Sequence, residues 1–136
     1  MTDFVRLDYV EKLLREMGLS GVCKADLKEG TIRIAVRYDP FYAEKARIRR
    51  LINLVDSDEL RDQLNHLLNM MENASVYTTV VVAEIPGAAW RLRANLEMIS
   101  RRVNDAKSRV PGIKAVMRKV DSYIKEYLRA RGKNVE

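Results

Sequence analysis

Residues 31–38 read TIRIAVRY, and the strict alternation of apolar and polar side chains in this stretch predicts a β-strand with one buried face. One face carries Ile32, Ile34, Val36 and Tyr38, and the other carries Thr31, Arg33, Ala35 and Arg37. The second face is therefore mixed and basic. Residues 21–27 predict a partner strand, because Lys28-Glu29-Gly30 is suited to a bulged hairpin turn in which Gly30 supplies a positive φ.

Helical patterns flank this hairpin on both sides. Before it, apolar residues recur with helical spacing at Leu7, Val10, Leu14 and Met17. After it, Asp39-Pro40 is typical of a helix start, since Asp can cap free N–H groups and Pro needs no partner there.

The helical pattern that follows Asp39-Pro40 is interrupted once. Apolar residues run to Val55, and the next set begins five residues later at Leu60. Asp56 with Glu59 resembles a capping-box restart, so we expect two helices or one kinked helix.

Residues 76–85 form the longest stretch rich in β-branched side chains. Both of its faces contain apolar residues, which favours a central strand covered on two sides. Because a long helical connection precedes it, we expect this strand to run parallel to one strand of the hairpin. Pro86-Gly87 ends it.

The C-terminal part of the sequence, residues 86–131, predicts a helical hairpin. Apolar residues keep a 3-4 alternation as far as Val110, Pro111-Gly112 is expected to turn the chain, and the pattern then resumes. The apolar residues form a seam along the helices, and this seam packs either within one chain or against a second chain. As an oligomer or partner interface it would consist of Leu92, Leu96, Ile99, Val103, Val120 and Ile124.

These patterns define a small α+β protein with a three-stranded sheet, a β-hairpin plus one strand, and a C-terminal helical hairpin. At 136 residues the chain fits a single domain. We divide it into an α-β-β-α-α-β portion over residues 1–85, a basic αα-hairpin over 86–131 and a frayed tail over 132–136.

Positive charge is concentrated in the C-terminal part of the chain. The net charge is +6, but residues 86–136 hold 13 basic and 5 acidic side chains, whereas residues 1–85 hold 12 basic and 14 acidic ones. An anionic partner is therefore expected to meet the C-terminal segment. The alternative is that the surplus of Arg, 16 against 9 Lys, serves solubility or reflects a thermophile-like composition.

The basic residues of the last predicted helix form a stripe. At 100° per residue, four of them fall within about 60° of one another and opposite the apolar face. They are Lys114, Arg118, Lys125 and Arg129. Arg91, Arg102 and Arg109 form a second stripe on the preceding predicted helix. Such stripes are suited to contact with a phosphate backbone. The alternative is an ordinary solvated face, in which Asp121 pairs with Lys125 four residues later.

Residues that support catalysis are scarce. Cys23 is the only cysteine and His66 the only histidine, and no glycine-rich phosphate loop is present. The acidic residues 56–62 are explained better by a helix N-terminus than by a metal. We therefore expect no enzyme, no cofactor and no metal. No apolar run approaches the roughly 20 residues of a membrane helix, and one cysteine suits the cytoplasm.

The sequence thus favours a non-enzymatic, oligomeric protein that binds DNA or RNA through backbone contacts, since it contains no base-reading motif. The alternative is a protein-binding scaffold subunit that uses the patterned helices and has no membrane role.

Overall fold

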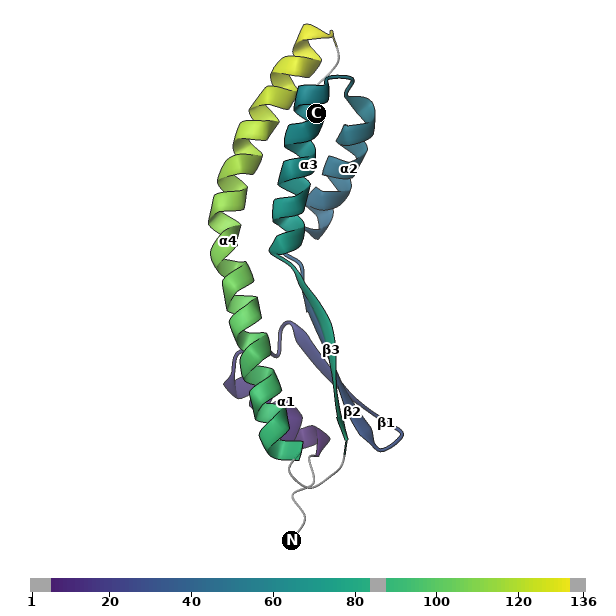
Figure 1. Cartoon of the computed structure of the whole chain (residues 1–136), viewed down its shortest axis with the longest axis vertical. Helices are drawn as coiled ribbons and strands as arrows, with labels where there is room; N and C mark the ends of the chain where they lie inside the picture. The colour runs from purple at the N-terminus through teal and green to yellow at the C-terminus, as the bar shows by residue number, and fades with distance from the viewer. Residues whose placement is uncertain (1–5, 84–87, 133–136) are drawn as a thin grey trace. The chain divides into compact units, whose positions relative to one another are not determined.

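The computed structural model describes residues 6–83 and 88–132 of the chain. Along these residues the elements are α1 (Leu7–Glu16), β1 (Cys23–Lys28), β2 (Thr31–Tyr38), α2 (Tyr42–Leu54), α3 (Asp58–Asn73), β3 (Val76–Ala83) and α4 (Ala88–Ala130), shown in Figure 1. The α+β class with a three-stranded sheet is confirmed. The strand end expected at Pro86-Gly87 lies outside the described residues. So does the frayed tail expected over 132–136, except for Gly132, which follows α4 in a turn.

The chain forms two compact units, and each is assembled from two separate stretches of sequence. Unit 1 contains residues 1–38 and 76–105, and unit 2 contains residues 39–75 and 106–136. Helix α4 contributes its first part to unit 1 and its second part to unit 2. The expectation of a single domain stays a prediction.

The sheet of unit 1 is antiparallel throughout, in the order β1-β2-β3. The expected parallel third strand is therefore wrong. Tyr38, the last residue of β2, pairs directly with Val76, the first residue of β3. The 37 residues between them leave the sheet and return at the same place, as a long hairpin loop does, so no crossover is needed.

The β1–β2 hairpin closes with a tight turn. Lys28 pairs with Thr31, which leaves a two-residue loop of Glu29 and Gly30. Both have positive φ, 51° and 75°, as the favoured two-residue hairpin turn requires. The positive φ of Gly30 is confirmed, whereas the expected bulge is replaced by this tighter turn.

Only one face of the sheet is buried. Ile32, Ile34 and Val36 are 3% exposed or less, and the buried residues of α1 and of the first part of α4 account for the layer that covers them. Arg93 of α4 donates a hydrogen bond to the Tyr9 hydroxyl of α1 at 3.1 Å, so these two helices contact each other.

The third strand is an edge strand and is covered on one side only, contrary to the sequence-based expectation. Tyr77 and Val81 are 51% and 55% exposed. Their apolar character reflects the preference of aromatic and β-branched residues for strands rather than a second covering layer.

Unit 2 consists of α2, α3 and the second part of α4 around one apolar core. Phe41, Ile48, Leu64, Leu67 and Met71 belong to it, together with three residues of α4. Those three are Ile113, Val120 and Ile124. The core therefore fixes one side of α4 against α2 and α3 and leaves its other side to solvent.

The predicted break between α2 and α3 is confirmed, but its cap differs. The Ser57 hydroxyl, not Asp56, accepts the hydrogen bond from the Leu60 N–H at 3.3 Å. Helix α2 also begins later than Asp39-Pro40 predicted, at Tyr42. Asp39 instead forms a buried ion pair with Lys45 at 2.8 Å.

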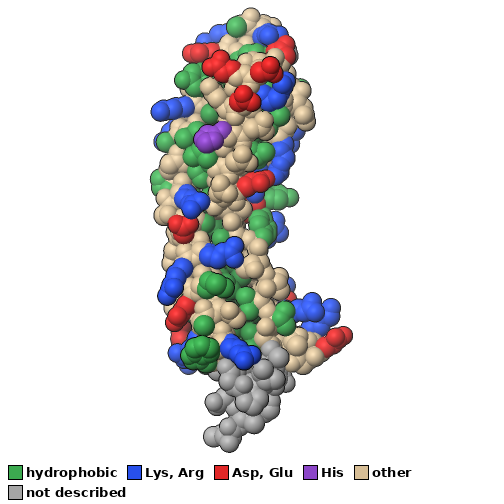
Figure 2. Space-filling model, in the orientation of Figure 1, with side chains coloured by type: hydrophobic (Ala, Val, Ile, Leu, Met, Phe, Trp, Pro, Cys, Tyr) green, Lys and Arg blue, Asp and Glu red, His purple; other side chains and the backbone are tan. Residues whose placement is uncertain are grey.

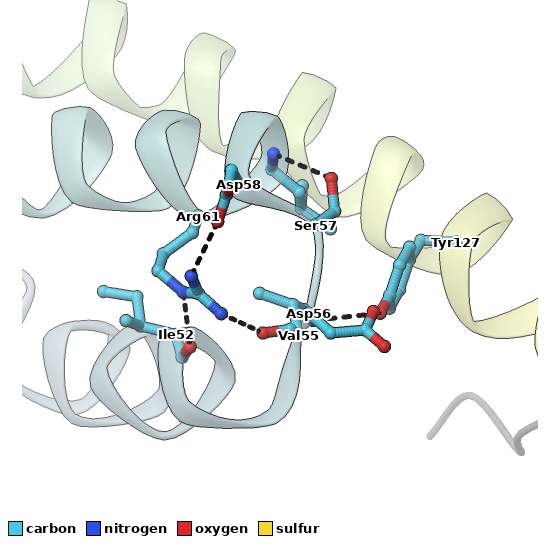
Figure 3. Close-up of polar contacts among 8 residues, drawn as sticks. Ile52, Val55, Asp56, Ser57, Asp58, Arg61 and Tyr127 are labelled. Atoms are coloured by element: carbon cyan, nitrogen blue, oxygen red, sulfur yellow. Dashed lines mark hydrogen bonds and ion pairs between the residues drawn. The ribbon is translucent and has the colours of Figure 1, made fainter.

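The connection between α2 and α3 is held by polar contacts within unit 2 (Figure 3). The Arg61 guanidinium donates to the backbone carbonyls of Ile52 and Val55, at 3.4 and 2.7 Å, which satisfies acceptors at the C-terminal end of α2. The Tyr127 hydroxyl of α4 accepts from the Asp56 N–H at 3.1 Å and donates to the Asp56 carboxylate. These contacts fix the end of α4 to the α2–α3 connection.

Residues 88–130 form one continuous helix, so the predicted turn at Pro111-Gly112, and with it the αα-hairpin, is wrong. Pro111 lies inside the helix with its side chain exposed. An interior Pro costs about 3 kcal/mol. The buried residues Ala106, Ile113 and Val120 keep a seven-residue spacing across it, so a continuous helix buries the same side on both flanks, which offsets this cost.

Candidate nucleic-acid interface

The predicted basic stripe lies on the solvent side of α4 in unit 2. Lys114, Arg118, Lys125 and Arg129 are all exposed, and they follow one another on the side of the helix away from its buried residues. From Lys114 to Arg129 the rise of 1.5 Å per residue gives a length of roughly 22 Å. None of the four forms an ion pair within the described part of the chain. We call these four residues the α4 basic face.

The acid nearest to this face is engaged elsewhere. The carboxylate of Asp121 forms an ion pair with Arg47 of α2 at 3.0 Å. The pairing of Asp121 with Lys125 that the sequence suggested is not formed, because the core brings α2 alongside α4 at this point. Lys125 is thus not paired with Asp121, and Arg47 lies at the border of the α4 basic face.

Lys107 extends the α4 basic face and was missed by sequence reasoning. It is exposed and lies seven residues before Lys114, which places it within about 20° of Lys114 around the helix. The seven-residue spacing was visible in the sequence. It was not used because Pro111-Gly112 was expected to separate the two residues into different helices.

The second predicted stripe does not join the first. Arg109 is five residues before Lys114, or roughly 140° around the helix, and it lines a small surface pocket with Met70, Asn73 and Ile113. Arg91 and Arg102 are exposed and belong to unit 1. The structure therefore supports one basic face in unit 2, and these three arginines lie apart from it or in the other unit.

The predicted partner interface is buried inside the chain. Its six members are between 0% and 4% exposed: Leu92, Leu96, Ile99, Val103, Val120 and Ile124. The first four lie in unit 1 and the last two in unit 2. Side chains buried to this degree offer no surface to a second chain, which favours the alternative that the seam packs within one chain.

The structure gives little support to catalytic chemistry at the cysteine. Cys23 is buried in β1, and burial raises the pKa of its thiol, which disfavours the reactive thiolate. His66 is exposed on α3. Among the described residues no group of three or more His, Cys, Asp or Glu side chains converges on a possible metal position.

The acidic residues around the start of α3 make structural contacts. Figure 2 shows Asp and Glu side chains gathered at this end of unit 2. Asp58 pairs with Arg61 at 3.0 Å, and Asp56 pairs with Arg131 at 2.6 Å. The hydrogen bond from Tyr127, followed by the contact with Arg131, lowers the pKa of Asp56. Asp56 thus holds the end of α4, whereas Asp58 is paired within α3.

No described helix combines the length and apolar character that crossing a membrane requires. Figure 2 instead shows Lys and Arg side chains at intervals along the edge formed by α4. Comparison of the chain with family models, with curated proteins and with solved structures found no match.

Proposed function

We propose that this protein binds nucleic acid through its phosphate backbone, with the α4 basic face as the contact surface. Lys114, Arg118, Lys125 and Arg129 are the phosphate contacts, and Lys107 and Arg47 lie beside them. The proposal assigns no catalytic residue, and it fits the cytoplasmic location that the single cysteine favours.

The observation that carries the proposal is the separation of opposite charges around α4. Asp121 is neutralised by Arg47, so four cations spread over roughly 22 Å face solvent without an ion pair in the described chain. Cations that are already paired gain little from a phosphate, whereas solvated ones release counterions from nucleic acid when they bind.

The shape of the α4 basic face favours a long polyanion. Duplex DNA carries about one phosphate per 1.7 Å of axis, so a 22 Å length offers about 13 phosphates, more than enough to meet four cations. Its residues are Lys and Arg spaced along one helix. We expect contacts to the backbone and little preference for base sequence.

Binding of a labelled 20-base-pair DNA duplex at about 50 mM salt tests the proposal. A variant with Lys114, Arg118, Lys125 and Arg129 changed to Gln removes the α4 basic face. The matched control changes Lys12, Arg15, Arg101 and Lys119 to Gln, which removes the same charge from exposed positions outside it.

We expect the first variant to lose affinity at least about tenfold and the control to stay within about threefold of wild type. Equal losses in both variants would mean that only net charge matters. No binding by wild type would reject the proposal and leave the scaffold alternative.

A further inference from the structure

The sheet of unit 1 has an uncovered face with its own chemistry. Strands β1 and β2 place four basic side chains and one acid on it, and β3 adds an aromatic ring. The full set is Lys24, Asp26, Lys28, Thr31, Arg33, Ala35, Arg37, Tyr77, Thr79 and Val81. We call this set the open sheet face. In Figure 2, Lys and Arg side chains are visible over the end of the β1–β2 hairpin.

The register of the strands arranges this face in rows. Arg37 lies opposite Tyr77, and Arg33 lies between Asp26 and Val81. The row between them has the small side chain of Ala35 at its centre, next to Lys24 and Thr79. Larger side chains therefore surround a low point at Ala35, and the two arginines of β2 are about 14 Å apart along the strand.

Tyr77 presents an aromatic surface to solvent. Its side chain is 51% exposed, and the Arg37 guanidinium lies 5.9 Å from the ring centroid, a cation–π arrangement. An exposed Tyr on a strand, held beside a cation, combines the two groups that recognise an unpaired nucleotide. The ring stacks on the base, and the cation meets the phosphate.

We infer that the open sheet face binds single-stranded nucleic acid, with Tyr77 as the stacking residue and Lys24, Arg33 and Arg37 as phosphate contacts. The excess of four cations over one acid gives charge complementarity to a nucleic-acid strand. Stacking on Tyr77 requires a base with a free face. A duplex does not offer one, because its bases are stacked on each other. This site lies in unit 1 and does not depend on the α4 basic face.

The test compares a labelled dT oligonucleotide with an abasic oligonucleotide of the same length and charge, and repeats the comparison with a U oligonucleotide. It is made in the 136-residue chain and again in the variant that lacks the α4 basic face. The substitutions are Tyr77→Ala, Tyr77→Phe and the control Tyr123→Ala, a residue of unit 2 that is 53% exposed.

We expect Tyr77→Ala to weaken binding of the base-containing strand about 5- to 100-fold and to leave the abasic strand unchanged, in both backgrounds. Tyr77→Phe and Tyr123→Ala should bind as the parent does. The two sites can fail separately. If the α4 basic face does not bind nucleic acid, the variant that lacks it will bind a duplex as well as wild type does. The effect of Tyr77→Ala on binding of single strands will still be seen in that case.

Equal affinity for base-containing and abasic strands would overturn the inference. A concentration-dependent dimer that Tyr77→Ala abolishes would also overturn it and assign the face to a second copy of the chain. If circular dichroism shows that Tyr77→Ala does not fold, Lys24→Gln with Arg33→Gln replaces it. That pair should reduce the salt slope for single strands by about 1.4, and an unchanged slope would reject the site.

Discussion

The buried ion pair between Lys45 and Asp39 allows the most quantitative prediction about folding. The two side chains are only 8% and 4% exposed, and their charged atoms are 2.8 Å apart. At an effective dielectric constant of about 20, Coulomb attraction at this distance is about 6 kcal/mol, most of which offsets the loss of hydration. Lys45→Met removes one partner and leaves the Asp39 carboxylate buried without its cation. The free energy of unfolding should fall by about 3 to 5 kcal/mol.

Urea unfolding at pH 7, followed by circular dichroism, measures this effect. With a denaturant slope of about 2 kcal/mol per molar, the midpoint should shift down by roughly 2 M. Adding Asp39→Asn to Lys45→Met should recover part of the loss, because no charge then remains buried. Lys12→Met, at a pair that is 3.9 Å apart and mostly exposed, should change stability by less than about 0.5 kcal/mol. A loss below about 1 kcal/mol for Lys45→Met would contradict a buried charge pair at this position.

Three further changes test other parts of the account. Pro111→Ala restores the missing N–H donor inside α4 and should raise the free energy of unfolding by up to about 3 kcal/mol in urea, whereas a destabilised variant would contradict a continuous helix. Asp56→Asn should lower the urea midpoint at pH 6. Because the native pKa of Asp56 lies below its unfolded value, its stabilising effect is present above about pH 4 and is lost as the pH falls through the native pKa; an equal difference at pH 2 would contradict this. Asp121→Asn releases Arg47 from its ion pair beside the α4 basic face and should tighten duplex binding a few-fold, which a filter-binding titration would show; unchanged or weaker binding would mean that the released Arg47 does not contact the duplex.

Local patterns were sufficient to predict most of the elements. The alternation in residues 31–38 and the change of phase after Val55 depend on neighbouring residues alone, and the structure places β2 and the α2–α3 break where these patterns indicate. The direction of β3 depends on the pairing of Tyr38 with Val76, which are distant in sequence. No local pattern specifies such a pairing, so the parallel strand was predicted wrongly.

The error at Pro111 has a different origin. Pro111-Gly112 is a strong turn signal locally, but the buried positions on each side keep one helical phase, and packing of both flanks outweighs the local preference. The same error concealed Lys107. The pairing of Arg47 with Asp121 could not be read from the sequence either, because it forms only when α2 packs beside α4.

The salt dependence of duplex binding measures how many phosphates the α4 basic face contacts. Four phosphate contacts predict a slope of log affinity against log salt of about −3.6 from the α4 basic face alone, equivalent to a roughly 150-fold loss between 50 and 200 mM salt. Neutralising Lys114, Arg118, Lys125 and Arg129 should reduce the magnitude of the measured slope by about that amount, and the off-face control should leave it unchanged. A slope that is the same in wild type and in the neutralised variant would contradict the assignment of nucleic-acid binding to this face.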